Sequence, residues 1–120
     1  MSTNSPSPES FLPLRPVEFE VLLSLGRQST HGYAILIDAE ARSGERFELG
    51  TLYRALRRME AQGLIQRVDA PAGAESEDER RRYYALTALG RSVASAETRR
   101  MEGLVRLARN LRLAEGQGAG

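Results

Sequence analysis

Residues 47–65 read FELGTLYRALRRMEAQGLI, and this stretch decides the fold that we expect. Its large apolar residues recur at the i, i+4, i+7 spacing of one buried stripe on an α-helix, and they are Leu52, Leu56 and Met59. Gly63 fits the left-handed position that ends a helix. The stretch therefore predicts an amphipathic helix over residues 51–62.

The other face of this helix is polar and basic. It carries, in chain order, Thr51, Arg54, Arg57, Arg58 and Ala61. Guanidinium groups form paired hydrogen bonds with phosphates and with guanine edges, so a helix of this kind can present arginines to a polyanion. A solvated face of an ordinary helix is the alternative, and the flanking segments decide between the two.

The composition bounds the class of protein. The chain has 120 residues, of which 41% are hydrophobic and 28% charged, enough for one globular domain. It has no cysteine and one histidine, and it has no base-and-nucleophile set, glycine-rich phosphate loop or calcium loop. We therefore expect no enzyme, cofactor or metal. Without a membrane-length apolar run or a signal peptide, we expect a cytoplasmic protein.

Charge is segregated along the chain, although the net charge is only +1. Residues 69–79 hold five acidic and no basic residues, whereas residues 87–113 hold six arginines and two glutamates. Such segregation bears on partners rather than on fold. All 17 basic residues are arginine. This indicates a bias in composition, which lowers the weight of any single arginine as a functional choice.

Helices and a hairpin surround the arginine-bearing helix. The expected elements are helices over 16–26 and 31–41, a short strand over 47–49, the helix over 51–62, and strands over 64–68 and 81–86. Tyr83 and Tyr84 should point to opposite faces of the last strand, one into the core and the other partly exposed. This order is that of a mainly α winged helix-turn-helix domain with a small β-hairpin, whose third helix enters the major groove.

The domain boundaries follow from this order. We expect a disordered arm over 1–13, the winged domain over 14–86, a long helix over 87–113 and a disordered tail over 114–120. The apolar stripe of the long helix consists of Leu89, Val93, Ala96, Met101, Leu104, Ala108 and Leu111. A domain of this size has no spare core for so long a helix, so we expect dimerisation through this stripe. Packing against its own domain is the alternative.

Five short motifs follow one another along the chain. They are THGYAI (30–35), GTLY (50–53), LRRME (56–60), GLI (63–65) and RYYALTALG (82–90). Over about residues 14–112 they resemble the PadR family of bacterial transcriptional regulators, in its shorter class with a single C-terminal helix. The resemblance implies a homodimeric repressor that binds a palindromic operator sequence-specifically. It also implies release of the operator by a small hydrophobic effector at the dimer interface.

Two features depart from the family pattern. Arg54 stands where many relatives have proline, which adds a charge to the side that faces DNA. An acidic run occupies residues 75–79 of the wing, where relatives are usually shorter and more basic. Because carboxylates repel phosphate, we expect the tip of the wing to point away from DNA or to be disordered.

The predicted DNA contacts are His31, Thr51, Tyr53, Arg54, Arg57, Arg58, Arg81 and Arg82. Thr51 and Tyr53 lie in a first helical turn, whose free N–H groups favour phosphate. Arg54 and Arg58 are i, i+4 neighbours, so we expect either to reach a guanine edge. Arg57, on the shoulder of that face, is expected to clamp the backbone.

Several alternatives remain open at this point. His31 can cap its helix, contact phosphate or, with Asp38 and Glu40, bind a metal, although the spacing of these carboxylates does not favour the last. Arg81 and Arg82 can contact phosphate or neutralise the acidic loop. An effector pocket is expected beside Leu22, Val93 and Met101. The rival function is a winged-helix module that binds protein, with an acidic wing that keeps nucleic acid away.

Overall fold

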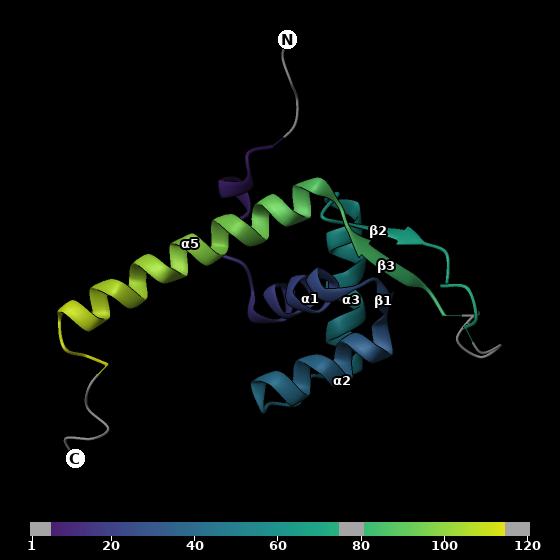
Figure 1. Ribbon diagram of the computed structural model, residues 1–120, viewed down its shortest axis with the longest axis horizontal. Coiled ribbons are helices and arrows are strands. Elements are labelled where there is room, and N and C mark those ends of the chain that lie inside the picture. The colour runs from purple at the N-terminus through teal and green to yellow at the C-terminus, as the bar shows by residue number, and fades with distance from the viewer. Residues whose placement is uncertain (1–5, 75–80, 115–120) are drawn as a thin grey trace, which may run out of the picture.

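The structure is a computed structural model that describes residues 6–74 and 81–114. Its elements are the 3-10 helix η1 (Pro8–Phe11), α1 (Pro16–Arg27), β1 (Thr30–His31), α2 (Gly32–Ser43), α3 (Leu49–Ala61), β2 (Ile65–Val68), β3 (Tyr83–Leu86) and α5 (Ala88–Asn110). Helices α1 to α3 gather beside the small sheet, and α5 runs out past them as a rod (Figure 1). The predicted winged-helix fold is confirmed.

Local hydrogen bonds explain where the helices begin and end. Pro16 opens α1, where a missing N–H costs nothing, and Nδ1 of His31 caps α2 by accepting the N–H of Ala34 at 3.2 Å. Gly44, with φ of 77°, ends α2 in the left-handed conformation. The hydroxyl of Thr87 accepts the N–H of Gly90 at 2.9 Å and thereby caps α5.

The sheet has three antiparallel strands in the order β1-β3-β2. The hairpin of β2 and β3 agrees with the sequence, whereas the pairing of Thr30 and His31 with β3 was not foreseen. The predicted strand over 47–49 is wrong, because Leu49 begins α3 and the N–H of Phe47 is bound by the Glu40 carboxylate at 2.8 Å. The acidic run at 75–79 lies outside the described residues.

Both tyrosines of β3 are buried, so the expectation that one would be partly exposed is wrong. Tyr84 belongs to the main core. Tyr83 faces the other way and is covered by β1, where the His31 ring meets it edge-on with centroids 5.3 Å apart. β1 thus extends the hairpin by one strand, and its His31 ring covers the Tyr83 ring, which the sequence leaves open to solvent.

The core lies between α1, α2, α3 and β2. The apolar stripe predicted for α3 is confirmed, since Leu52, Leu56 and Met59 are each at most 1% exposed, with Ala55 beside them. Burying each such side chain contributes roughly 1.5–3 kcal/mol. The stripe therefore fixes how α3 is rotated about its own axis.

Only the second half of α5 extends beyond the domain. Val93 and Ala96 are buried within the protomer and Leu89 packs against its core, so their assignment to a dimer interface is wrong. The first half of α5 lies against α1 and β3, which take up the apolar stripe that we expected a second copy to cover. From Leu104 onward the leucines of the stripe are exposed.

The segment before α1 is structured where the sequence predicted a disordered arm over 1–13. Phe11, Leu12 and Leu14 pack against the core, and η1 lies on α5. Apolar side chains at 11, 12 and 14 explain the difference, because they have surface to bury despite their Pro- and Ser-rich surroundings. Residues 1–5 and 115–120, at the ends of the predicted arm and tail, lie outside the described residues.

Glu97, a buried residue of α5, binds the segment before α1 through a hydrogen bond to the backbone of Leu14. Its carboxylate is 2% exposed and accepts the N–H of Leu14 at 3.0 Å and two N–H groups of Arg100 at 2.6 and 3.0 Å. The bonds from Arg100, and then that from Leu14, lower the pKa of Glu97 below 4.5 against the effect of burial. The resulting stability is present above pH 4.5 and is lost as the pH falls through the lower pKa of the folded state.

We predict that Gly90→Ala destabilises the fold by about 1–3 kcal/mol, because a Cβ at Gly90 would overlap the backbone carbonyl oxygen of Leu64. Gly26→Ala is the control, since a Cβ there meets no atom within 4 Å. It should be neutral or stabilising by up to about 1 kcal/mol. Urea denaturation followed by circular dichroism measures both, and equal midpoints would contradict the close packing of α5 on the backbone of Leu64.

Candidate nucleic-acid interface

The outward face of α3 is set by its buried stripe. The exposed residues of this face are Gly50, Tyr53, Arg54, Arg57 and Ala61. Arg54 lies back along the helix towards its first turn, where its guanidinium donates to the hydroxyl of Thr51 at 3.3 Å. Two guanidinium groups and a phenol therefore lie on one solvent-facing surface, which we call the α3 face.

Arg58 does not belong to the α3 face. Its Nε donates to Oε2 of Glu18 in α1 at 3.0 Å, and the Glu18 side chain is only 10% exposed. Arg57, which we expected on the shoulder, is the exposed neighbour of Arg54 instead. The expectation that Arg54 and Arg58 share the outward face is wrong, because burial of Met59 turns Arg58 towards α1.

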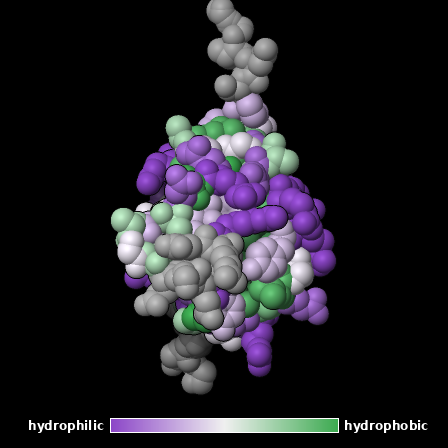
Figure 2. Space-filling view, turned by 90° about the vertical axis from the view of Figure 1, so that its right-hand side faces the viewer, coloured by the Kyte–Doolittle hydropathy of each residue, from purple (hydrophilic) through white to green (hydrophobic). Residues whose placement is uncertain are grey.

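A surface hollow of about 230 Å³ brings together residues from three parts of the chain. It is lined by His31, Gly32, Tyr33, Tyr53, Arg81 and Arg82. Four of the eight predicted contacts thus meet at one place, between the start of α2, α3 and the residues that lead into β3. Figure 2 looks onto this wing end of the molecule, where strongly hydrophilic surface spreads across the upper and right-hand parts of the face.

Close packing shapes this hollow. A Cβ at Gly32 would lie 2.8 Å from Cε1 and 3.1 Å from the hydroxyl oxygen of Tyr53, so the Tyr53 ring lies directly against the start of α2. The guanidinium of Arg81 stacks over the Tyr33 ring, 5.4 Å from its centroid. The hollow therefore combines a helix N-terminus, a phenol and two arginines, which together suit an anion such as phosphate.

His31 serves the structure as a cap and as a cover. Its Nδ1 holds the N–H of Ala34, and its ring packs on Tyr83. The carboxylates that a metal site would need are engaged elsewhere, because Asp38 accepts from Ser24 and Arg42, and Glu40 accepts from Phe47. Within residues 6–74 and 81–114, no three potential ligands are grouped to hold a metal ion.

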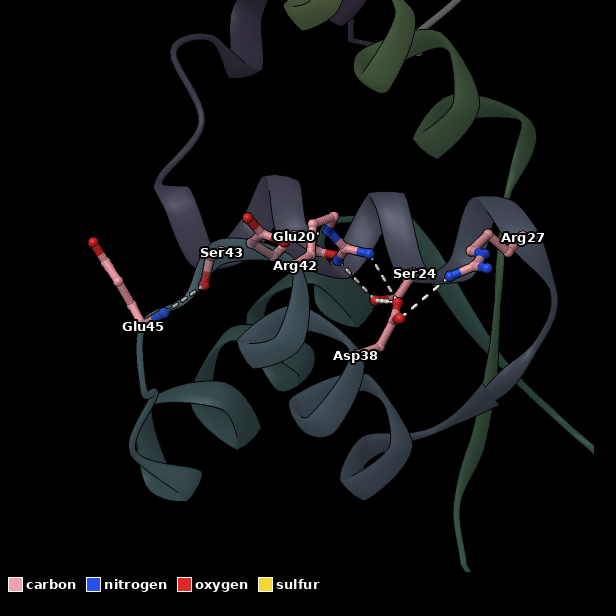
Figure 3. Close-up of polar contacts among 7 residues, drawn as sticks. All are labelled: Glu20, Ser24, Arg27, Asp38, Arg42, Ser43 and Glu45. Atoms are coloured by element: carbon pink, nitrogen blue, oxygen red, sulfur yellow. Dashed lines mark hydrogen bonds and ion pairs between the residues drawn. The ribbon is translucent and has the colours of Figure 1, made fainter.

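A polar network between α1 and α2 was not foreseen from the sequence (Figure 3). Arg42 joins Glu20 at 2.7 Å and Asp38 at 2.9 Å, and the Ser24 hydroxyl donates to Asp38 at 2.7 Å. Hydrogen bonds from Ser24 and then Arg42 lower the pKa of Asp38. The i, i+4 pair of Asp38 and Arg42 was the one available signal. Since the buried polar atoms among the described residues all have partners, we assign this network to holding α2 on α1.

The exposed half of α5 is apolar along much of its length. Leu104, Leu107 and Leu111 are each more than half exposed. A shallow groove of about 430 Å³ runs along one side, lined by Thr98, Met101, Glu102, Val105, Arg106 and Arg109. The predicted effector pocket is corrected here, because Leu22 and Val93 are fully buried while Met101 lines this groove. In the part of the chain described, no helix is long and apolar enough to span a membrane.

These features define a winged-helix protein with a basic, solvent-facing third helix. Residues 21–96 match the model of the transcriptional regulator PadR-like family, which is more than half of the chain. The protein therefore belongs to the PadR-like family of transcriptional regulators, as the sequence motifs indicated.

Solved structures with this fold include two PadR-type regulators. A PadR family transcription regulator from Clostridium difficile has a TM-score of 0.69 at 23% identity, over 81% of this chain and 98% of that one. A PadR-like regulator from Bacillus cereus has a TM-score of 0.68 at 21% identity, over 79% and 89%. An uncharacterised 37.1 kDa protein from a Streptomyces fradiae transposon is 37% identical over 84 residues, which are 70% of this chain and 22% of that longer protein.

We predict that the two adjacent arginines of α3 differ in their effect on stability. Arg58→Met should lower the free energy of unfolding by about 1–2 kcal/mol, because it leaves the Glu18 carboxylate without its charged partner, an effect that partial exposure of the pair reduces. Arg57→Met should change it by less than about 0.5 kcal/mol. Urea midpoints compare the two variants, and an equal loss from both would contradict the placement of Arg58.

Proposed function

We propose that this protein is a homodimeric, cytoplasmic transcriptional repressor that binds a palindromic DNA operator sequence-specifically. The observation that carries the proposal is the continuity of the α3 face with the basic hollow at the start of α2. Tyr53 belongs to both, so arginines aimed at a major groove lie beside a site suited to the phosphates of its edge.

The predicted contacts then divide by role. Arg54 and Arg57, exposed side by side, are the candidates for reading base edges. Arg81, Arg82 and Tyr53 line the hollow at the N-terminus of α2, and we propose that they hold phosphates there. The remaining three predicted residues, Thr51, His31 and Arg58, support these groups by holding Arg54, capping α2 and fixing α3 on α1, respectively.

Dimerisation is proposed through the second half of α5. Its apolar stripe is covered by the protomer as far as Ala96. Beyond this residue Met101 and Ala108 are partly exposed, and Leu104 and Leu111 are exposed. A two-fold related copy of the same helix would cover it, since an isologous contact pairs a patch with itself. The contact would also enclose the groove beside Met101 and Val105, which we propose as the place for a small hydrophobic effector that releases the operator.

The rival is a winged-helix module that binds protein and not DNA. The acidic run at residues 75–79 favours it, because carboxylates on a wing oppose phosphate. The exposed arginines of the α3 face favour DNA. The two functions are separated by the dependence of duplex binding on salt, since each phosphate that a protein neutralises lowers log K by about 0.9 per unit of log[salt].

We predict that the protein retards a duplex from its own promoter region in a gel, competes specifically against random DNA and loses affinity linearly in log[salt] with a slope of about −5 or steeper. Arg54→Ala should then cost about 1–3 kcal/mol at one base position if Arg54 reads a base, and the same at all sequences if it holds a phosphate. The absence of any competable shift at low salt would favour the protein-binding module.

We predict that Leu104→Glu converts the dimer to a monomer and lowers operator affinity, because a carboxylate would be buried in the centre of the two-fold contact. Multi-angle light scattering measures the mass, and fluorescence anisotropy measures DNA binding. Arg99→Glu is the control, since Arg99 is exposed on α5 and, among the described residues, bonds to Ser95 of the same helix. An unchanged dimer mass for Leu104→Glu would show that the interface lies elsewhere.

A further inference from the structure

Two buried carboxylates bind two consecutive backbone N–H groups just before α1. Glu97 of α5 accepts the N–H of Leu14 at 3.0 Å, and Glu18 of α1 accepts the N–H of Arg15 at 2.9 Å. Taken over the whole residue, Glu97 is 2% exposed and Glu18 is 7% exposed. Charges so buried are retained only where their hydrogen bonds are made, so both oxygens of each carboxylate need fixed partners.

The second oxygen of Glu18 extends this connection to α3. This oxygen accepts the Nε–H of Arg58 at 3.0 Å. Glu97 in turn accepts two N–H groups of Arg100, which belongs to the same helix as Glu97. A continuous series of bonds therefore runs from α5 through Leu14 and Arg15 to Glu18 and then to Arg58. Its two ends are the helix proposed to dimerise and the helix proposed to enter DNA. We call this series the Glu97–Arg58 connection.

Glu97 lies at a point where a small change in the direction of α5 would move the far end of this helix by a large distance. It lies in the last turn of α5 that the protomer buries, after which the rod leaves the body (Figure 1). The N-terminal segment crosses α5 at this level before it enters α1. From Glu97 to Asn110 the helix extends about 20 Å, so a rotation of about 10° at Glu97 would move its end by about 3.4 Å, one base-pair step of DNA.

We propose that Glu97 and Glu18 are positioning residues that fix the direction of α5 relative to α3, and thereby set the half-site spacing that the dimer accepts. The inference rests on the proposed function, because it presupposes a dimer formed by α5 and DNA binding by α3. Neither carboxylate touches DNA or the second copy in this scheme. They act by fixing the angle between α5 and α3, and this angle determines which half-site spacings the dimer binds.

The test compares duplexes whose half-sites are separated by the native spacing, by one base pair more and by one base pair fewer. In Glu97→Gln an amide N–H₂ replaces one acceptor and faces the donors of Leu14 or Arg100, and Glu18→Gln does the same towards Arg15 or Arg58. Each should lower the preference for the native spacing about tenfold, within the usual range of coupling between sites. The dimer mass should be unchanged.

Two further variants complete the design. Glu20→Gln is the matched control, because Glu20 is also in α1 and also pairs with an arginine, Arg42, but lies outside the Glu97–Arg58 connection. Its spacing preference should equal that of the wild type. If Glu97→Gln does not fold by circular dichroism, Arg100→Gln tests the same link, since it removes the two bonds that hold the Glu97 carboxylate against the N–H of Leu14.

Failure of the inference is distinguishable from failure of the proposed function. A wild-type protein that is monomeric or binds no duplex contradicts the proposed function, and the inference with it. A wild-type dimer with a clear spacing preference that the Glu97, Glu18 and Arg100 variants keep within twofold overturns the inference alone. The same is true if Glu20→Gln broadens the preference equally, because the effect would then reflect general loosening of α1.

Discussion

Burial of one stripe of α3 is the constraint on which the rest of the structure depends. Leu52, Ala55, Leu56 and Met59 are almost fully buried against α1, α2 and β2, so the helix cannot rotate about its axis without exposing them. The opposite face, which carries Arg54 and Arg57, is therefore held in one direction, towards solvent. Because the helix is already fixed in position, DNA binding would not have to order it, and this preorganisation favours affinity.

The limited size of the hydrophobic core explains why α5 has a buried half and an exposed half. The domain has enough apolar surface to cover the helix as far as Glu97, and there the buried carboxylate binds the incoming chain. Beyond that turn, leucines are exposed at a density that a monomer in water rarely maintains. These exposed leucines are the basis of the proposed dimer. A second copy would bury this surface and would hold two α3 faces on the same side of one duplex.

The sequence predicted the order of the elements and the buried stripe of α3, because each depends on residues close together in the chain. It missed what depends on distant pairs. Nothing near Thr30 indicates that β1 pairs with β3 and covers Tyr83. Arg57 and Arg58 look alike in the sequence, and only Glu18, forty residues away, distinguishes them. The apolar stripe of α5 was read correctly, but the sequence could not show where the protomer stops covering it.

The most direct measurement of whether the α3 face enters DNA uses the absence of cysteine from the chain. A single cysteine placed at Ala61, exposed at the end of α3, can carry an iron chelate that cleaves nearby DNA. We expect two clusters of cuts, related by two-fold symmetry and centred about 10 base pairs apart, one in each half-site. No cleavage from position 61, with cleavage from the same chelate at Glu102 on the exposed half of α5, would contradict the orientation of the protein on DNA.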